Sequence, residues 1–358
     1  MRQFSLSANI EEGFASEAKY IVTPNVRQVA EGIVNGFRSG VHSYTIIGSY
    51  GTGKSSFLLA LERDLMGGKQ YELLNPSELS EKKFEVLKIV GDYKELSVLL
   101  SQKLSVDGTA DSILDELKTK YNKLKSQRKF LVIFIDEFGK VLEHAAKNNP
   151  ERELYFMQKL AEFVNVPSRN ILLLTTLHQN FNAYSRKLNE VQKEEWTKVK
   201  GRFQELVFVE PIEQLLYLAS TQIDASRTMQ NDDSLIDSLA SLAKKTGFVS
   251  QNFSEATAQA LAPLEPFAAY VITQAIQRYG QNERSLFSFL NARGRNSLSE
   301  YEGKIYQLQC CYDYIYYNFY SYLKEANADS MQWSSMQVAI EKVNYGIPRQ
   351  TLWMPSSW

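Results

Sequence analysis

Residues 48–55 read Gly-Ser-Tyr-Gly-Thr-Gly-Lys-Ser and fit the pattern G-x-x-x-x-G-K-[ST] at every position. Glycines let the backbone curl so that successive N–H groups point at an anion, and the helix that should follow adds its partial positive charge. A lysine at this spacing reaches the β- and γ-phosphates of a nucleotide, and the hydroxyl after it is a magnesium ligand. The loop therefore predicts a nucleoside triphosphate site, with Lys54 on the phosphates and Ser55 on the metal. The predicted binding residues are Gly48, Ser49, Tyr50, Gly51, Thr52, Gly53, Lys54, Ser55 and Ser56.

A second motif ends in two carboxylates. Residues 130–137 read Phe-Leu-Val-Ile-Phe-Ile-Asp-Glu, and such an apolar run is typical of a strand buried on both faces of a parallel sheet. In a chain with a P-loop, we interpret Asp136 as the residue that orients magnesium through water. Glu137 is then the base that polarises an attacking water. The string Asp-Glu-Phe-Gly is no kinase signature, because no kinase catalytic loop accompanies it.

Two further polar positions follow along the chain. The apolar run 171–176 turns polar at its end, where open α/β sheets place groups that contact ligands. Thr176 is predicted to contact the γ-phosphate or the lytic water, with Thr175 and His178 behind it. The alternative is a pair of ordinary strand-end hydroxyls that cap the next loop. Arg202 precedes the last expected strand, and its planar, permanently charged fork suits the nucleotide of a neighbouring subunit.

The elements that must position these residues alternate between strand and helix. Apolar runs predict strands at 44–47, 84–90, 130–135, 171–176 and 204–209. Helical spacing predicts helices from about 24 to 38, from Lys54, and at 92–104, 110–127, 151–163 and 182–200. From about residue 212 the chain is expected to be helical. The predicted fold class is α/β, with a parallel sheet flanked by helices and followed by an all-helical region.

The 358-residue chain, 44% apolar and 23% charged, has the composition of an ordinary globular protein. Its formal net charge of −1 gives no whole-protein attraction to nucleic acid or to an anionic membrane. The apolar runs have the length of core strands, and the first residues lack the apolar stretch of a signal peptide. Adjacent Cys310 and Cys311 indicate two reduced thiols, so we expect a cytoplasmic protein without a membrane partner. The basic run 118–129 is predicted to be a solvated helix face, with a nucleic-acid contact as the alternative.

The order and spacing of these motifs resemble those of AAA+ ATPases. The junction Phe208-Val209-Glu210-Pro211, with the helix expected after it, is similar to the branch that contains Orc/Cdc6 initiators and STAND ATPases. The resemblance implies ATP and Mg²⁺ as cofactors, a helical lid that starts near residue 212, and Arg202 as an arginine finger. Residues 280–284, Gly-Gln-Asn-Glu-Arg, resemble the sensor 2 motif of the lid, which implies that Arg284 approaches the γ-phosphate. A surface arginine after a helix-ending glycine is the alternative for Arg284.

Three short strings, at 135–143, 196–203 and 283–290, resemble large bacterial ATPases of phage-defence gene clusters. Those ATPases usually continue into a winged helix and effector regions, whereas this sequence ends in a poorly patterned, aromatic-rich stretch, 346–358. We therefore expect a truncation, a split gene, or a short subunit whose effector is carried by a partner. In such ATPases, apolar residues upstream of the P-loop wall the adenine, which implies base contacts for Ile21 and Val22. A hydrophobic staple of the first helix is the alternative.

The resulting domain prediction has four parts. Residues 1–40 form a linker and first helix, 41–211 the P-loop ATPase core, 212–300 the helical lid, and 301–358 an aromatic helical extension with an irregular tail. The aromatic residues of 312–322 cover nearly every face of a helix, so we expect them to pack against another domain or a partner, before a core role or base stacking. Two functions fit this organisation. One is a homo-oligomeric motor or loader acting on nucleic acid or a partner complex; the other is a slow nucleotide switch that regulates an effector subunit.

Overall fold

The computed structural model describes residues 9–13, 20–68, 70–74, 77, 79, 82–186, 188–223, 233–280, 286–291, 295–324 and 329–344. The chain divides between Val209 and Glu210 into two compact units. The first contains a sheet with helices, and the described elements of the second are helices apart from one isolated β-bridge. In the described part of the chain, every helix is too short or too polar to cross a lipid bilayer.

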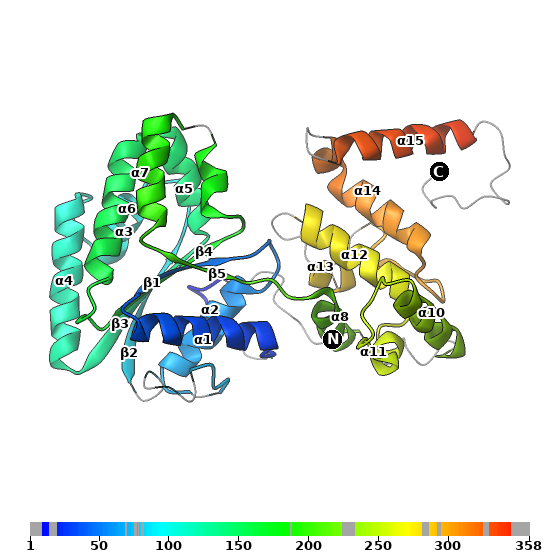
Figure 1. Cartoon of the computed structure of the whole chain (residues 1–358), viewed down its shortest axis with the longest axis horizontal. Coiled ribbons are helices and arrows are strands. Elements are labelled where there is room, and N and C mark those ends of the chain that lie inside the picture. Colours follow the sequence, from blue (N-terminus) through cyan, green and yellow to red (C-terminus); the bar gives the residue numbers. More distant parts are fainter. Residues whose placement is uncertain are drawn as a thin grey trace. The chain divides into compact units, whose positions relative to one another are not determined.

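The first unit is built on a five-stranded sheet in which every neighbouring pair of strands is parallel (Figure 1). The strand order is β2-β3-β4-β1-β5. The strands are β1 (Ser43–Ile47), β2 (Lys83–Val90), β3 (Lys129–Asp136), β4 (Ile171–Leu177) and β5 (Gln204–Val207). The helices are α1 (Pro24–Arg38), α2 (Lys54–Leu65), α3 (Leu96–Leu104), α4 (Ala110–Ser126), α5 (Phe138–Lys147), α6 (Pro150–Val164), the 3₁₀ helix η2 (Phe181–Ser185) and α7 (Glu190–Lys200).

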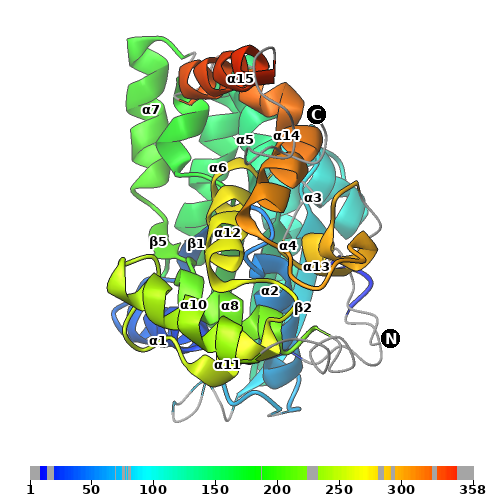
Figure 2. The ribbon, with the colours of Figure 1, turned by 90° about the vertical axis from the view of Figure 1, so that its right-hand side faces the viewer.

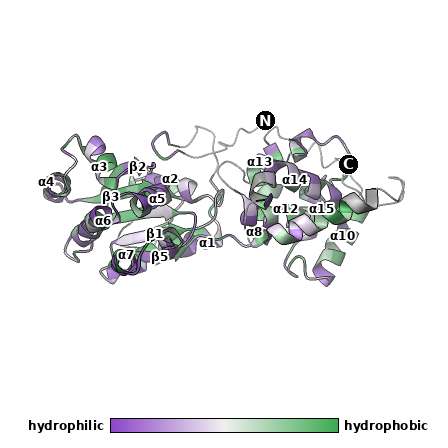
Figure 3. Ribbon diagram, turned by 90° about the horizontal axis from the view of Figure 1, so that it is seen from above, coloured by the Kyte–Doolittle hydropathy of each residue, from purple (hydrophilic) through white to green (hydrophobic). Residues whose placement is uncertain are grey.

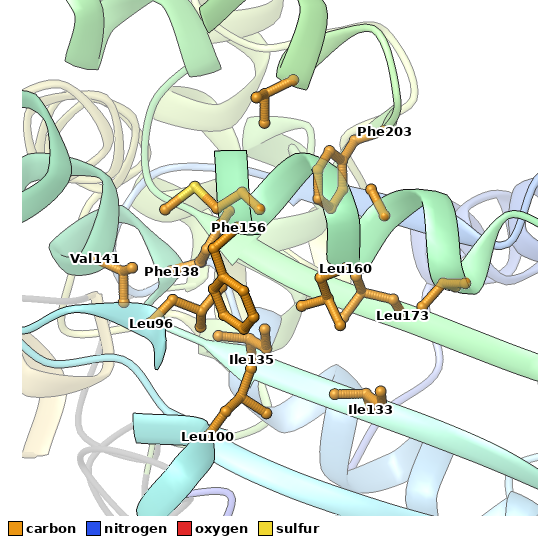
Figure 4. Close-up of a cluster of buried hydrophobic side chains, with 14 of the residues drawn as sticks. Leu96, Leu100, Ile133, Ile135, Phe138, Val141, Phe156, Leu160, Leu173 and Phe203 are labelled. Atoms are coloured by element: carbon orange, nitrogen blue, oxygen red, sulfur yellow. The ribbon is translucent and has the colours of Figure 1, made fainter. Parts of the chain in front are cut away.

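Helices cover both faces of this sheet. Along β3, Val132 and Phe134 face a core shared with α1 and α2, whereas Ile133 and Ile135 face a core shared with α3 to α7. Figure 4 shows the second core, with Ile135 next to Phe156 of α6. Figure 3 shows hydrophobic colour where helices meet the sheet and hydrophilic colour on outer helix surfaces such as that of α4. A strand buried on both faces reads as a continuous apolar run, which is why the sequence reveals it.

The predicted fold class is confirmed, with a parallel sheet flanked by helices and a helical region after it. Two helix predictions need correction. The single helix expected at 182–200 is instead η2 and α7, because Asn189 starts a new helix through a capping box with Gln192. The sequence pattern also left α5 unpredicted, although its residues Val141, Leu142 and Ala145 are apolar at helical spacing and buried.

The second unit packs around α12 (Pro266–Tyr279), which contacts α8, α10, α13 and α14 (Figure 2). The other elements are α8 (Ile212–Ser220), α10 (Asp233–Lys245), α11 (Glu255–Ala260), α13 (Leu286–Asn291), η3 (Leu298–Glu300), α14 (Leu308–Lys324) and α15 (Ser330–Asn344). The aromatic stretch lies on α14 and contributes to the core of this unit, since Tyr314 and Phe319 are buried in it. Tyr320, on the same helix, is 45% exposed. The expectation that packing against another domain or partner dominates in this segment was therefore wrong for Tyr314 and Phe319.

Candidate functional site

The P-loop connects β1 to α2 at the carboxyl edge of the sheet. Gly51 and Gly53 have φ of +73° and +95°, in the left-handed region that glycine adopts without strain. Gly48 leaves the sheet between its neighbours and donates its N–H to the Leu177 carbonyl at 3.0 Å. A Cβ on Gly48 would lie 2.1 Å from the carbonyl oxygen of Phe208. The first glycine of the motif is therefore required by the strand beside it as well as by the loop.

Lys54, the first residue of α2, folds back onto the loop. Its Nζ donates to the carbonyl oxygens of Gly48 and Ser49, at 2.5 and 2.7 Å. Burial lowers the pKa of Lys54 to about 8, against the opposing influence of the Asp136 and Glu137 charges. Because the Lys54 ammonium is desolvated and held only by neutral carbonyls, an added anion would stabilise it. The P-loop N–H groups also favour a bound anion. The loop thus fits the phosphates of a nucleotide.

Asp136 ends β3 and is only 3% exposed. Its Oδ1 accepts from the Thr176 hydroxyl at 2.5 Å and from the Glu137 N–H at 3.1 Å. Among the described residues, none donates a hydrogen bond to the other oxygen, Oδ2. The described residues contain no group of three or more His, Cys, Asp or Glu side chains able to hold a metal. That is compatible with Mg²⁺ on Ser55, because Mg²⁺ usually takes one or two protein ligands plus phosphate oxygens and waters.

Glu137 has a strained backbone and an accessible carboxylate. Its φ of +51° is unfavourable for a residue with a Cβ, by roughly 1–2 kcal/mol. The residue caps α5, and its side chain, 42% exposed, forms an ion pair with Lys140 one turn later. Gly91 makes this turn sterically feasible, because a Cβ there would lie 2.4 Å from the Glu137 carbonyl oxygen. Gly91 was not predicted from the sequence, although a glycine directly after a predicted strand was a usable signal.

Thr176 is almost completely buried and links the two acidic residues. Its hydroxyl donates to Asp136 and accepts from the Glu137 N–H at 2.9 Å. The hydroxyl therefore orients both the Asp136 carboxylate and the strained turn at Glu137. Thr175 points elsewhere and donates to the Tyr44 carbonyl at 3.2 Å. Contact between Thr176 and a γ-phosphate or water stays a prediction.

Replacing Thr176 by valine should remove both hydrogen bonds and leave buried polar groups unpaired. We expect the free energy of unfolding to fall by about 1–3 kcal/mol, measured by urea denaturation without nucleotide. Thr176→Ser keeps the hydroxyl and should retain most of that stability. A loss in Thr176→Ser as large as that in Thr176→Val would show that the hydroxyl alone does not maintain this stability.

Two aromatic side chains tie the tip of the loop to the end of β4. The Tyr50 ring stacks on His178, with centroids 4.4 Å apart and planes 21° apart. The Tyr184 hydroxyl of η2 is 3.0 Å from His178 Nδ1, and a Cβ on Gly139 would lie 2.3 Å from that hydroxyl oxygen. Burial, with the Lys54 charge second, lowers the pKa of His178 to about 4. The sequence contains no local signal for Tyr184, because η2 brings it here.

His178 should make stability depend on pH. Its pKa is about 4 when folded and about 6.5 when unfolded, so the unfolded chain binds the proton first as pH falls. Stability from this group is present above pH 6.5 and is lost as pH falls toward 4, by about 2 kcal/mol at pH 5. We expect His178→Gln to lose correspondingly less stability between pH 7 and pH 5 in denaturant titrations. If the original protein and His178→Gln lost the same stability between pH 7 and pH 5, groups other than His178 would be responsible for the pH dependence.

Arg202 lies at the opposite edge of the sheet from the P-loop. It precedes β5, whose Gln204 pairs with Tyr44, and its carbonyl accepts from the Ser43 hydroxyl at 2.6 Å. The five residues of β1 separate this point from the loop by about 16 Å. The guanidinium instead pairs with Glu162 at 3.0 Å. Arg202 therefore does not join the nucleotide site of its own chain, and its action on a neighbour stays a prediction.

The remaining predicted site residues are Ile21, Val22 and Arg284. Val22 is half-buried against the core shared with α1 and α2, and Ile21 is half-buried beside it. Thr23 caps α1, which places Arg27 where a hydrophobic staple would need an apolar residue, so the staple is not formed there. Adenine contacts by Ile21 and Val22 stay a prediction. Arg284 lies outside the described residues.

Comparison with known proteins gives only distant likenesses. No protein-family model and no curated protein matches the chain. Among solved structures, it is similar to the ORC2 protein of Aeropyrum pernix in ADPNP–ADP complexes, with 14% identity, a TM-score of 0.41 and 70% of both chains covered. The match to the ORC1 protein of the same organism, in complex with DNA, has 15% sequence identity and a TM-score of 0.37. It covers 75% of this chain and 63% of that one. The match to Drosophila ORC bound to DNA has 12% sequence identity and a TM-score of 0.40. It covers 89% of this chain and 67% of that one. The fold assignment therefore rests on this chain's own sheet order and loop geometry.

Proposed function

We propose that this chain is an ATP-binding and ATP-hydrolysing module of the AAA+ type, dependent on Mg²⁺. The observation that supports it most is the hydrogen-bonded cluster of Asp136, Glu137 and Thr176 at the sheet edge that also bears the P-loop and Lys54. Parallel strands bring their carboxyl ends to one edge, so β1, β3 and β4 supply one site. In this proposal the buried carboxylate of Asp136 and the accessible carboxylate of Glu137 have separate roles.

Each residue has a role in this proposal. Lys54 and the loop N–H groups would bind the phosphates. Ser55 and Asp136 would hold the magnesium ion, Asp136 through a water. The metal would neutralise charge that develops on the phosphate oxygens. Glu137 accepts a proton from the attacking water, and Thr176 holds the turn that carries it. Ile21 and Val22 would contact the adenine.

Coupling between subunits is the second part of the proposal. Arg202 and the P-loop lie at opposite edges of one sheet, so Arg202 can serve only the nucleotide of another subunit, in a head-to-tail assembly. Arg284 would sense the γ-phosphate from the helical lid and convert hydrolysis into movement. A role in bacterial antiviral defence or DNA transactions, in the cytoplasm, is supported only by the motif resemblance. The alternative is a slow, STAND-like switch that regulates a separate effector.

Mixing two inactive variants tests the oligomeric proposal. Lys54→Met should bind ATP only weakly, and Arg202→Ala should bind it but not complete a neighbour's site. Each variant alone should show little turnover, while a mixture should regain part of it, because the Lys54→Met subunit supplies Arg202 to the other. Light scattering should show assembly promoted by ATP. Tight ATP binding by a monomer with very slow turnover would favour the nucleotide switch. Full activity of Arg202→Ala would refute the role of Arg202 as an arginine finger.

A further inference from the structure

The amino edge of β2 and β3 carries a cluster of cations far from the nucleotide site. Lys83 and Lys129 are direct neighbours in the register of the two strands. The following residues, Phe84 and Phe130, contact each other in the core shared with α1 and α2, so the lysines project to the opposite face, which α4 covers. We call the cluster the basic edge. It consists of Lys82, Lys83, Lys123, Lys125, Arg128 and Lys129.

The charges of the basic edge are not neutralised within the described part of the chain. None of its six side chains has an ion pair there, whereas nearby Lys120 pairs with Glu85 and Lys88 pairs with Glu62. The stretch 117–130 contains no acidic residue, and Glu81 lies outside the described residues. Five of the six side chains are exposed, and Lys129 is half-buried. Like charges directly opposite on neighbouring strands destabilise a sheet, and a bound polyanion would remove that repulsion.

We propose that the basic edge binds the phosphate backbone of double-stranded nucleic acid, without regard to sequence. Protein interfaces usually have an apolar or aromatic centre, but the apolar residues between these cations, Leu124, Phe84 and Phe130, are buried. Backbone binding needs only charge. Single-strand binding would need exposed rings for stacking, and Tyr121, the aromatic residue of α4, is buried.

This surface is separate from the nucleotide site and from Arg202. Lys129 and Asp136 lie at the two ends of β3, about 23 Å apart. Three strand spacings, about 14 Å, separate β3 from β5 and hence the basic edge from Arg202. The inference therefore does not depend on ATP hydrolysis, and either can fail alone.

The test measures the binding of a short, fluorescently labelled duplex of arbitrary sequence. Fluorescence anisotropy reports the affinity at several salt concentrations. The variant combines Lys83→Gln, Arg128→Gln and Lys129→Gln. We expect at least a tenfold loss of affinity at low salt, and a salt slope reduced by about 0.9 for each phosphate that the variant no longer binds. The matched control removes three paired lysines, through Lys103→Gln, Lys193→Gln and Lys198→Gln, and should bind like the original protein.

Several outcomes would overturn the proposal. These are absence of duplex binding by the original chain, equal weakening in the variant and the control, and tighter binding of a single strand than of the duplex. Equal affinity for polyglutamate at the same charge density would indicate an acidic protein as the partner instead. Circular dichroism and ATP turnover should be the same in both triple variants, which separates a change at the surface from a change in the fold.

Discussion

Glu137→Gln should reduce ATP turnover by about 10²–10⁴-fold and leave nucleotide binding intact, because glutamine keeps the size of the side chain but cannot accept the proton. The carboxylate is accessible and interacts with Lys140 at the first turn of α5, so its replacement disrupts no buried interaction. The measurement is steady-state phosphate release, with a parallel titration of a fluorescent ATP analogue. We expect ATP turnover to fall while the affinity for the nucleotide stays unchanged.

The control for this variant is Glu151→Gln, an exposed carboxylate in the first turn of α6. It removes the same charge from the same unit and should leave turnover unchanged. Turnover retained in Glu137→Gln would transfer the role of base to another group. Loss of both turnover and binding would instead show that Glu137 supports the loop.

Lys54→Met should weaken ATP binding by about 10- to 100-fold, the loss expected for a charge-assisted hydrogen bond to phosphate. Without nucleotide the variant should be at least as stable as the original chain. The reason is that Lys54 is buried with a pKa lowered to about 8, so its charge is unfavourable until an anion arrives. The measurement is the Tm with and without Mg-ATP, together with the Kd.

The matched control is Lys94→Met, an exposed lysine paired with Asp92 near the same sheet edge. It should keep the full rise in Tm on addition of Mg-ATP. A Lys54→Met protein that still gains stability from ATP would mean that the loop N–H groups suffice. A large loss of stability without ATP would mean that Nζ is needed to hold Gly48 and Ser49.

The sequence alone was enough to predict the fold class and to identify the P-loop. A P-loop is recognisable because glycine adopts its left-handed backbone without strain, as at Gly51 and Gly53, and the lysine and serine follow directly. The strand before Asp136 is recognisable because burial on both faces requires an unbroken apolar run. These signals lie within a few consecutive residues. The break before α7 was harder, because a cap such as Asn189 interrupts a pattern that otherwise looks continuous.

Only the tertiary structure decided which distant residues meet. The polar end of an apolar run marked Thr176 as a candidate, but its hydrogen bond to Asp136 depends on β4 lying beside β3. Nothing local marks the Tyr184 that contacts His178. Strand order and direction placed Arg202 at the edge opposite the P-loop and put Lys83 beside Lys129. The physical reason is that the order of the strands is decided by how the connecting helices pack on the whole sheet. A short sequence pattern does not specify which strands become neighbours.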